Sequence, residues 1–195
     1  YLLRPLELGI DLVMHSGTKY LGGHGDIIAG EVAGSHALMK SVRTVALKHI
    51  GSPIGPQEAY LLQRGVKTLP LRMDAHLHNA QKVADFLAAH PAVKKVIYPG
   101  LANHPGHDAL GAFASGFGGM VSIELEGGFA RCATLLDNLQ LFVQAVSLGD
   151  LESLACHPAS TTHAAMDEAS RLAAGVNDDL IRFSIGVEDA DDLIA

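Results

Sequence analysis

The order of apolar and polar residues along the chain predicts a mixture of strands and helices. The runs DLVMH at 11–15 and IIAGEVAG at 27–34 are short, apolar and rich in β-branched residues. Such runs are typical of strands that are covered on both faces, so we expect two buried strands here. In GGMVSIEL at 118–125 the odd positions from 121 onward are apolar and the even positions are polar. This alternation predicts a strand with one buried face.

Helical spacing dominates two other stretches. One helix is expected at 35–49, and a longer helical pattern runs over 56–89. Pro56 suits the first turn of a helix, where its missing N–H costs nothing, and Pro70 is expected to kink or split the longer pattern. After Pro70, helical spacing predicts one buried face made of Met73, Leu77, Ala80, Ala84 and Leu87.

The remaining elements complete an α/β pattern. Strands are expected at 93–97, 141–147 and 180–187. Helices are expected at 128–139, from Asp189 onward and, as a short helix, within 103–115. The stretch 150–179 is expected to be loop and helix. Strands that alternate with helices place the chain in the α/β class. We expect a domain boundary near residue 70, which separates 1–70 from 71–195.

Composition narrows the classes of protein. The chain has 195 residues, is 48% hydrophobic and carries a formal charge of −7, which argues against a nucleic-acid partner. No apolar run has the roughly 20 residues that a transmembrane helix needs, and no signal peptide is recognised, so we expect no membrane partner. Cys132 and Cys156 form no CxxC pair, which favours free thiols and the reducing cytoplasm. The abrupt start at Tyr1 leads us to expect a piece of a longer chain, or a processed one.

One lysine stands out chemically. In HSGTKYLGGHGD (His15–Asp26) Lys19 follows an apolar run and two hydroxyl residues, and a glycine cluster comes after it. A lysine that reacts with a carbonyl must first lose its proton, which a desolvated site favours. Small hydroxyls beside it can bind a phosphate. On this pattern alone, a surface lysine in a turn is the simpler interpretation, because a single lysine is weak evidence.

Several segments together resemble one enzyme family. They are HSGTKYLGGHGD, LLQRGVKTLPLRM at 61–73, YPGL at 98–101, GGMVSIEL, AVSLGDLESLACHPASTTH at 145–163 and LIRFSIGVEDADDLI at 180–194. In this order they resemble the Cys/Met-metabolism (trans-sulfuration) family of PLP-dependent enzymes, and within it the methionine γ-lyases most. The resemblance implies fold type I, the aspartate-aminotransferase fold. Residues 1–70 would then end the PLP-binding large domain and begin the interdomain helix, and 71–195 would be the small C-terminal domain.

The resemblance also implies roles for single residues. Lys19 is similar to the lysine that binds PLP covalently and moves the substrate proton, and Ser16 and Thr18 are similar to hydroxyls on the cofactor phosphate. Ser147 and Arg182 resemble the pair that binds the substrate α-carboxylate. The family often has alanine at the position of Gly17, a change that we expect to be minor. The family's other cofactor contacts, including a Tyr-x-Arg pair from a neighbouring subunit, lie before the lysine in its sequence order.

The strand at 180–187 offers a physical check on Arg182. Its apolar residues at 181, 183, 185 and 187 point one way, and Leu180, Arg182, Ser184 and Gly186 point the other way. Arg182 therefore leaves the strand on its less apolar face, where small residues leave room for a carboxylate. Without the resemblance, an arginine on a solvated sheet face is the simpler interpretation.

Three positions concern the substrate pocket that the resemblance implies, and two of them, Val146 and His49, bear on which reaction is catalysed. Val146 resembles the apolar residue of methionine γ-lyases, whereas cystathionine-specific members have Glu there; Thr162 resembles a residue that lines the substrate pocket. His49 departs from the aspartate of methionine γ-lyases. The implied reaction is γ-elimination of methionine to methanethiol, 2-oxobutanoate and ammonia. Replacement chemistry on O-acetyl- or O-succinylhomoserine is the alternative, and a non-catalytic scaffold is a distant one.

The resemblance further implies a homotetramer built from dimers that share active sites. Because it places half of the cofactor site before the lysine, upstream of this sequence, we expect the 195 residues alone to be inactive. The eleven histidines invite a metal hypothesis. The closest pairs, His76 with His78 and His104 with His107, lack further ligands in sequence, whereas zinc needs about four, so we expect no metal.

Overall fold

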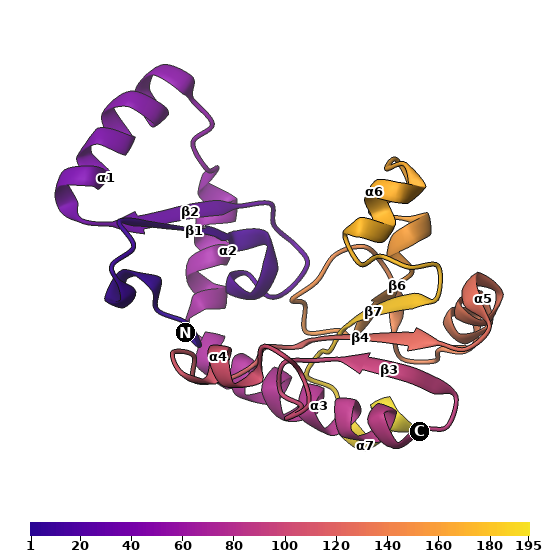
Figure 1. Ribbon diagram of the computed structural model, residues 1–195. Helices are drawn as coiled ribbons and strands as arrows, with labels where there is room; N and C mark the ends of the chain where they lie inside the picture. The colour runs from indigo at the N-terminus through magenta and orange to yellow at the C-terminus, as the bar shows by residue number, and fades with distance from the viewer. The chain divides into compact units, whose positions relative to one another are not determined.

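The computed structural model describes all 195 residues, and the chain divides into two compact units, Tyr1–Pro70 and Leu71–Ala195. Figure 1 shows the ribbon of both units. No helix combines the length and the apolar character that crossing a membrane requires.

The first unit contains a small antiparallel sheet and several helical segments. Strands β1 and β2 pair with Leu12 opposite Gly34 and Ser16 opposite Gly30. In chain order the elements are a 3-10 turn (Pro5–Leu8), β1 (Leu12–Ser16), a π-helical segment (Gly17–Leu21), β2 (Gly30–Gly34), α1 (His36–Val42), a second π-helical segment (Arg43–Ile50) and α2 (Pro56–Val66).

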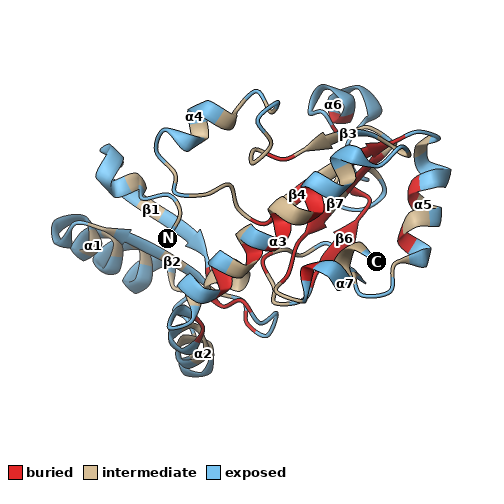
Figure 2. Cartoon of the chain, turned by 90° about the horizontal axis from the view of Figure 1, so that it is seen from below, coloured by how far each residue is buried: buried red, intermediate tan, exposed pale blue.

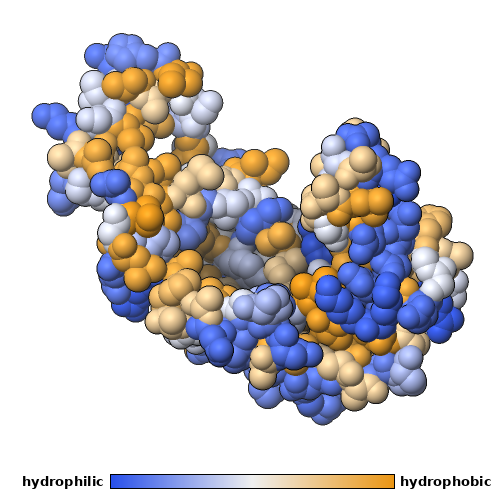
Figure 3. Space-filling model, in the orientation of Figure 1, coloured by the Kyte–Doolittle hydropathy of each residue, from blue (hydrophilic) through white to orange (hydrophobic).

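The expected burial of the first two strands was wrong. Met14 in β1 is 79% exposed, and Ile28, just before β2, is 88% exposed. The cause is the size of the sheet, because β1 and β2 pair only with each other and their own unit supplies no full covering layer. Apolar side chains are therefore at the surface around α1 and the two strands (Figure 3).

The second unit is built on a five-stranded mixed sheet of order β3-β4-β7-β6-β5. All neighbouring strands are antiparallel except β5 and β6, which are parallel. The elements are α3 (Leu69–Ala89), β3 (Val93–Ile97), α4 (His107–Gly111), β4 (Met120–Leu125), α5 (Gly128–Asn138), β5 (Val143–Gln144), β6 (Leu154–Cys156), α6 (Glu168–Ala173), β7 (Leu180–Ser184) and α7 (Ala190–Ile194). Helices and strands in this arrangement confirm the α/β class.

The core of this unit lies between the sheet and α3, where Figure 2 shows the buried residues of β4, β6, β7 and α3. The predicted apolar face of β4 is buried, because Val121 and Ile123 are 0% exposed and Leu125 is 4% exposed, but the opposite face is not fully open, since Glu124 is buried as well. The helical pattern splits as expected near Pro70, since α2 ends at Val66 and α3 begins at Leu69.

The buried face of α3 is more polar than its apolar spacing predicted. Met73, Ala80 and Ala84 are buried as expected, whereas the predicted Leu77 and Leu87 are only partly buried. His76 and Asn79 are buried in addition. A buried polar group is tolerated when its hydrogen bonds are made. These two side chains bind backbone carbonyls of the chain that follows β7.

Two strands differ from the sequence prediction. The strand expected at 141–147 shortens to Val143–Gln144, and β6 (Leu154–Cys156) lies within 150–179, where only loop and helix were expected. Three residues are too few to show a period of two. β6 is instead stabilised by its neighbours, because it pairs with both β5 and β7.

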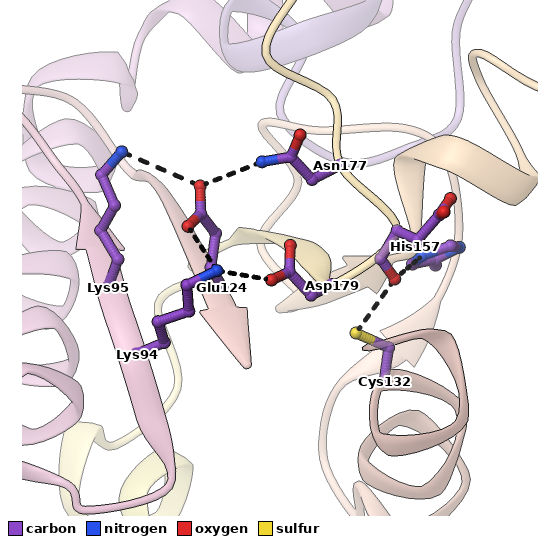
Figure 4. Close-up of polar contacts among 8 residues, drawn as sticks. Lys94, Lys95, Glu124, Cys132, His157, Asn177 and Asp179 are labelled. Carbon is purple, nitrogen blue, oxygen red and sulfur yellow. Dashed lines mark hydrogen bonds and ion pairs between the residues drawn. The ribbon is translucent and has the colours of Figure 1, made fainter. Parts of the chain in front are cut away.

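A cluster of ionic contacts surrounds the buried carboxylate of Glu124 in β4 (Figure 4). Lys94 Nζ and Lys95 Nζ lie 3.7 and 3.8 Å from its two oxygens, and Asn177 Nδ2 donates to Oε1 at 3.5 Å. Lys94 Nζ also donates to Asp179 Oδ2 at 3.0 Å. These contacts compensate the cost of burying the carboxylate and join β3 and β4 to the turn before β7.

Cys132 should be chemically inert in the folded chain. Burial, with a smaller contribution from the Asp179 carboxylate, raises the pKa of the Cys132 thiol to about 11. A raised pKa favours the neutral thiol, so only about one molecule in 10⁴ carries the reactive thiolate at pH 7. We expect iodoacetamide to label Cys132 slowly in buffer and rapidly in urea, as followed by peptide mass spectrometry. Equal rates in both solvents would contradict the burial of this thiol.

Candidate active site

The lysine segment forms a tight bend directly after β1. Ser16 ends the strand, and the π-helical segment Gly17–Leu21 follows it. At Lys19 the backbone leaves the helical region, with φ −89° and ψ −135°. The lysine therefore lies in an irregular bend at the end of a strand, as its sequence context predicted.

Gly17 is tightly enclosed. A Cβ added there would lie 2.6 Å from Glu31 Oε2 and 2.9 Å from the Cβ of Ala29. Both contacts are closer than real side chains allow, so alanine at this position requires Glu31 to move. A movement of the flexible Glu31 side chain would not be enough, because the Cβ of Ala29 moves only with its backbone, so the expectation that glycine or alanine is equivalent here does not hold in this chain.

Glu31 is a titratable group that the sequence pattern did not single out. It pairs with His15 across β1 and β2, and its Oε2 is buried without a hydrogen-bond partner. Burial raises the pKa of this carboxyl, which favours the neutral acid. The signal in the sequence was a single acid inside the otherwise apolar run IIAGEVAG.

The two hydroxyls beside Lys19 differ in their bonding. Ser16 is exposed and its hydroxyl makes no hydrogen bond within the chain. Thr18 Oγ1 accepts the N–H of Ala29 at 3.0 Å and donates to the carbonyl of Ala29 at 3.3 Å. That carbonyl also accepts the N–H of Thr18 at 3.2 Å, so it keeps a partner if the hydroxyl turns away.

This donor set fits a phosphorylated aldehyde such as PLP. A phosphate only accepts hydrogen bonds, and the Ser16 hydroxyl has a hydrogen to donate. Thr18 can donate its own by giving up the longer bond to Ala29. An amine from Lys19 and two small hydroxyls within four residues therefore match an aldehyde and its phosphate.

The second unit brings three of the expected site residues together. Arg182 lies on β7 between Ser122 of β4 and Cys156 of β6. Its Nη2 donates to the carbonyls of Val146 at 2.7 Å and Ser147 at 3.2 Å. A guanidinium has five N–H donors, so these bonds leave donors that can bind a carboxylate.

Thr162 does not join this group of site residues. It is exposed and its Oγ1 is 2.8 Å from His163 Nδ1, with no contact to Arg182. Thr161 is also exposed, and its hydroxyl donates to the carbonyl of His157 at 2.7 Å. Val146, Cys156 and Thr161 line a cavity of about 300 Å³ in this unit.

Comparisons with known proteins place these features in one family. The sequence profile of the family described as "Cys/Met metabolism PLP-dependent enzyme" matches residues 1–195. The L-methionine gamma-lyase of Pseudomonas putida is 52% identical over 196 residues, a match that covers 100% of this chain and 49% of that protein. The L-methionine gamma-lyase of Fusobacterium nucleatum subsp. nucleatum is 50% identical and is matched over 50% of its length, again with 100% of this chain.

A solved structure is also closely similar. It is the cystathionine gamma synthase of Xanthomonas oryzae pv. oryzae in complex with aminoacrylate and cysteine, with a TM-score of 0.94 and 45% identity. The superposition covers 99% of this chain and 50% of that one. The chain thus spans about half the length of the curated relatives it matches.

Proposed function

The chain belongs to the Cys/Met metabolism PLP-dependent enzyme family, which includes carbon–sulfur lyases and synthases, and on this basis we propose that the whole protein is a methionine γ-lyase. The reaction is γ-elimination of methionine to methanethiol, 2-oxobutanoate and ammonia. The observation that carries the proposal is the identity of 50–52% to two L-methionine gamma-lyases over the full chain.

In this proposal the two units belong to a fold type I enzyme. Tyr1–Pro70 is the end of the PLP-binding large domain, and Leu71–Ala195 is the small C-terminal domain. Lys19 would hold PLP covalently, and Ser16 and Thr18 would donate to its phosphate. When bound, PLP supplies an electron sink for the carbanion chemistry.

The side chains of this chain would then perform three tasks. The amine of Lys19, once exchanged for the substrate amine, would accept the proton from the substrate Cα and carry it away from that carbon, and a Cβ proton must also leave before the thiolate departs from Cγ. Arg182 and Ser147 bind the α-carboxylate and so orient the bond that breaks. Val146 provides an apolar surface toward the substrate side chain, which suits a thioether.

Substrate preference is the first prediction of this proposal. Methionine should release 2-oxobutanoate, and cystathionine should release much less. Its distal ammonium finds no partner at Val146, and an unpaired charge in a dry pocket costs affinity. The assay compares methionine, cystathionine and O-acetyl- and O-succinylhomoserine, each with and without added thiol or sulfide. Val146→Glu is the matched variant and should shift preference toward cystathionine.

The alternative function is γ-replacement on an O-acylhomoserine. His49, in place of the acid of dedicated methionine γ-lyases, favours it, as does the structural similarity to a cystathionine gamma synthase. Product that requires both an O-acyl ester and a thiol, without turnover of methionine alone, would replace the lyase proposal with this one.

We also propose that the whole protein is a cytoplasmic homotetramer and that the 195 residues alone are inactive. The two buried free thiols suit a reducing compartment. The exposed apolar side chains of Tyr1–Pro70 suit contact with further protein surface.

A further inference from the structure

Alternate residues of β7 and its continuation bind the segment that carries Ser147. We call residues 146–153 the clamp loop. Ser184 Oγ accepts the N–H of Gly149 at 2.9 Å. Glu188 accepts two bonds from Ser153, the N–H on Oε1 at 2.6 Å and the hydroxyl on Oε2 at 2.9 Å. Arg182 Nη2 donates to the carbonyls of Val146 and Ser147, the first two residues of the clamp loop. The loop is therefore bound at its start, middle and end.

The Ser153 and Ser184 side chains that make these bonds are buried, whereas the bond from Arg182 to the Val146 carbonyl is exposed. Ser153 is 0% exposed and Ser184 is 1% exposed. A buried donor that loses its acceptor pays the full cost of its desolvation, so these contacts strongly favour one loop conformation. The loop is therefore held in place before any substrate arrives.

Backbone contacts also join the clamp loop to the residues that follow β7. Gly186 N donates to Ser153 Oγ at 2.8 Å, and Val187 N donates to the carbonyl of Leu151 at 2.8 Å. A Cβ on Gly186 would collide with the Leu151 carbonyl and would lie 2.6 Å from Ser153 N, so only glycine permits this approach.

Helix α3 binds the residues that follow β7. Asn79 Nδ2 donates to the carbonyls of Gly186 and Glu188 at 3.1 and 2.7 Å, and His76 Nδ1 lies 2.7 Å from the carbonyl of Ile185. The chain after β7 is therefore fixed by the helix, and it in turn fixes the clamp loop.

We propose that Ser184 and Glu188 are positioning residues for the substrate carboxylate: they fix the clamp loop so that Ser147 and Arg182 form a preorganised binding site. The inference rests on the proposed carboxylate role of Ser147 and Arg182. Arg182 is bonded to the loop carbonyls, so a displaced loop moves the guanidinium and the Ser147 backbone together. Preorganisation of this kind raises affinity by avoiding the cost of ordering the site on binding.

The test measures how strongly the full-length PLP-bound protein prefers a carboxylate. The probes are L-norleucine, an amino acid without a leaving group, and 1-aminopentane, the same amine without the carboxylate. Equilibrium affinities are obtained by titrating the visible absorbance of the cofactor, which requires no turnover. Glu188→Ala and Ser184→Ala should each lower the norleucine-to-aminopentane affinity ratio by about tenfold, the size of one lost hydrogen bond to a charged or buried group. Affinity for 1-aminopentane should stay within about twofold.

Matched variants make the result specific. Glu188→Gln keeps one acceptor for the Ser153 N–H and should restore most of the ratio. Glu152→Ala removes an exposed acid of the same loop and should leave the ratio unchanged. If either positioning variant is too unstable to purify, the other carries the test.

Arg182→Ala separates the two proposals. If it removes the preference for norleucine while Ser184→Ala and Glu188→Ala keep the wild-type ratio, the positioning inference is wrong. If Arg182→Ala itself leaves the ratio unchanged, the carboxylate site is wrongly assigned and the inference falls with it. An equal loss of affinity for both probes in the positioning variants would indicate general damage and would also overturn the inference.

Discussion

Replacement of Lys19 by alanine should abolish the visible absorbance of the PLP-bound protein and reduce turnover by at least roughly 10²- to 10⁴-fold, the range for loss of one acid–base group. The loss has two physical sources. The covalent bond to the cofactor disappears, and so does the amine that moves the proton at the substrate Cα. The bend after β1 leaves no second lysine in Gly17–Leu21 to replace it.

The matched control is Lys40→Ala, which removes an exposed lysine of α1. It should keep the absorbance and the rate of the wild-type protein. A Lys19→Ala protein that retained a borohydride-reducible bond to PLP through another lysine would refute the assignment.

Arg182→Ala should lower kcat/KM by roughly 10²-fold or more, because each charge-assisted hydrogen bond to the carboxylate contributes about 1.5–3 kcal/mol. The carbonyls of Val146 and Ser147 also lose their partner, which loosens the clamp loop. Arg182→Lys should recover only part of the loss, because an ammonium cannot reproduce the planar, bidentate fork. The measurement is steady-state kinetics of the full-length protein with methionine.

Arg131→Ala is the control for this prediction, since Arg131 is an exposed arginine of α5 in the same unit. Its kcat/KM should equal that of the wild-type protein. An unchanged kcat/KM in Arg182→Ala would remove this arginine from the substrate site.

The fold was predictable where a periodic pattern is long enough to show a face. The alternation at 121–125 gave the buried face of β4, and Pro70 gave the break between α2 and α3. β6 was missed because its three residues carry no period and depend on pairing with β5 and β7. The burial of β1 and β2 was overestimated. Apolar content shows that a strand can be buried, but burial also needs neighbouring elements that cover it, and the sheet of β1 and β2 has only these two strands.

For the candidate site, residue types were predictable and their contacts were not. The sequence placed Arg182 on the less apolar face of its strand, and Val146 and Ser147 were expected near it by resemblance alone. Their actual contact runs through backbone carbonyls, which no side-chain pattern encodes. The roles of Ser184 and Glu188 depend on a loop that meets β7 from more than thirty positions away in sequence, as in the bond of Gly149 to Ser184.

The most direct measurement of the central claim is the identity of the residue that carries PLP. The full-length protein is purified with its cofactor, reduced with borohydride, digested and mapped by tandem mass spectrometry. The account predicts a single modified lysine, Lys19, in the peptide that contains SGTK. Modification of a different lysine, or a fully unmodified Lys19 in a protein that was yellow before reduction, would contradict it.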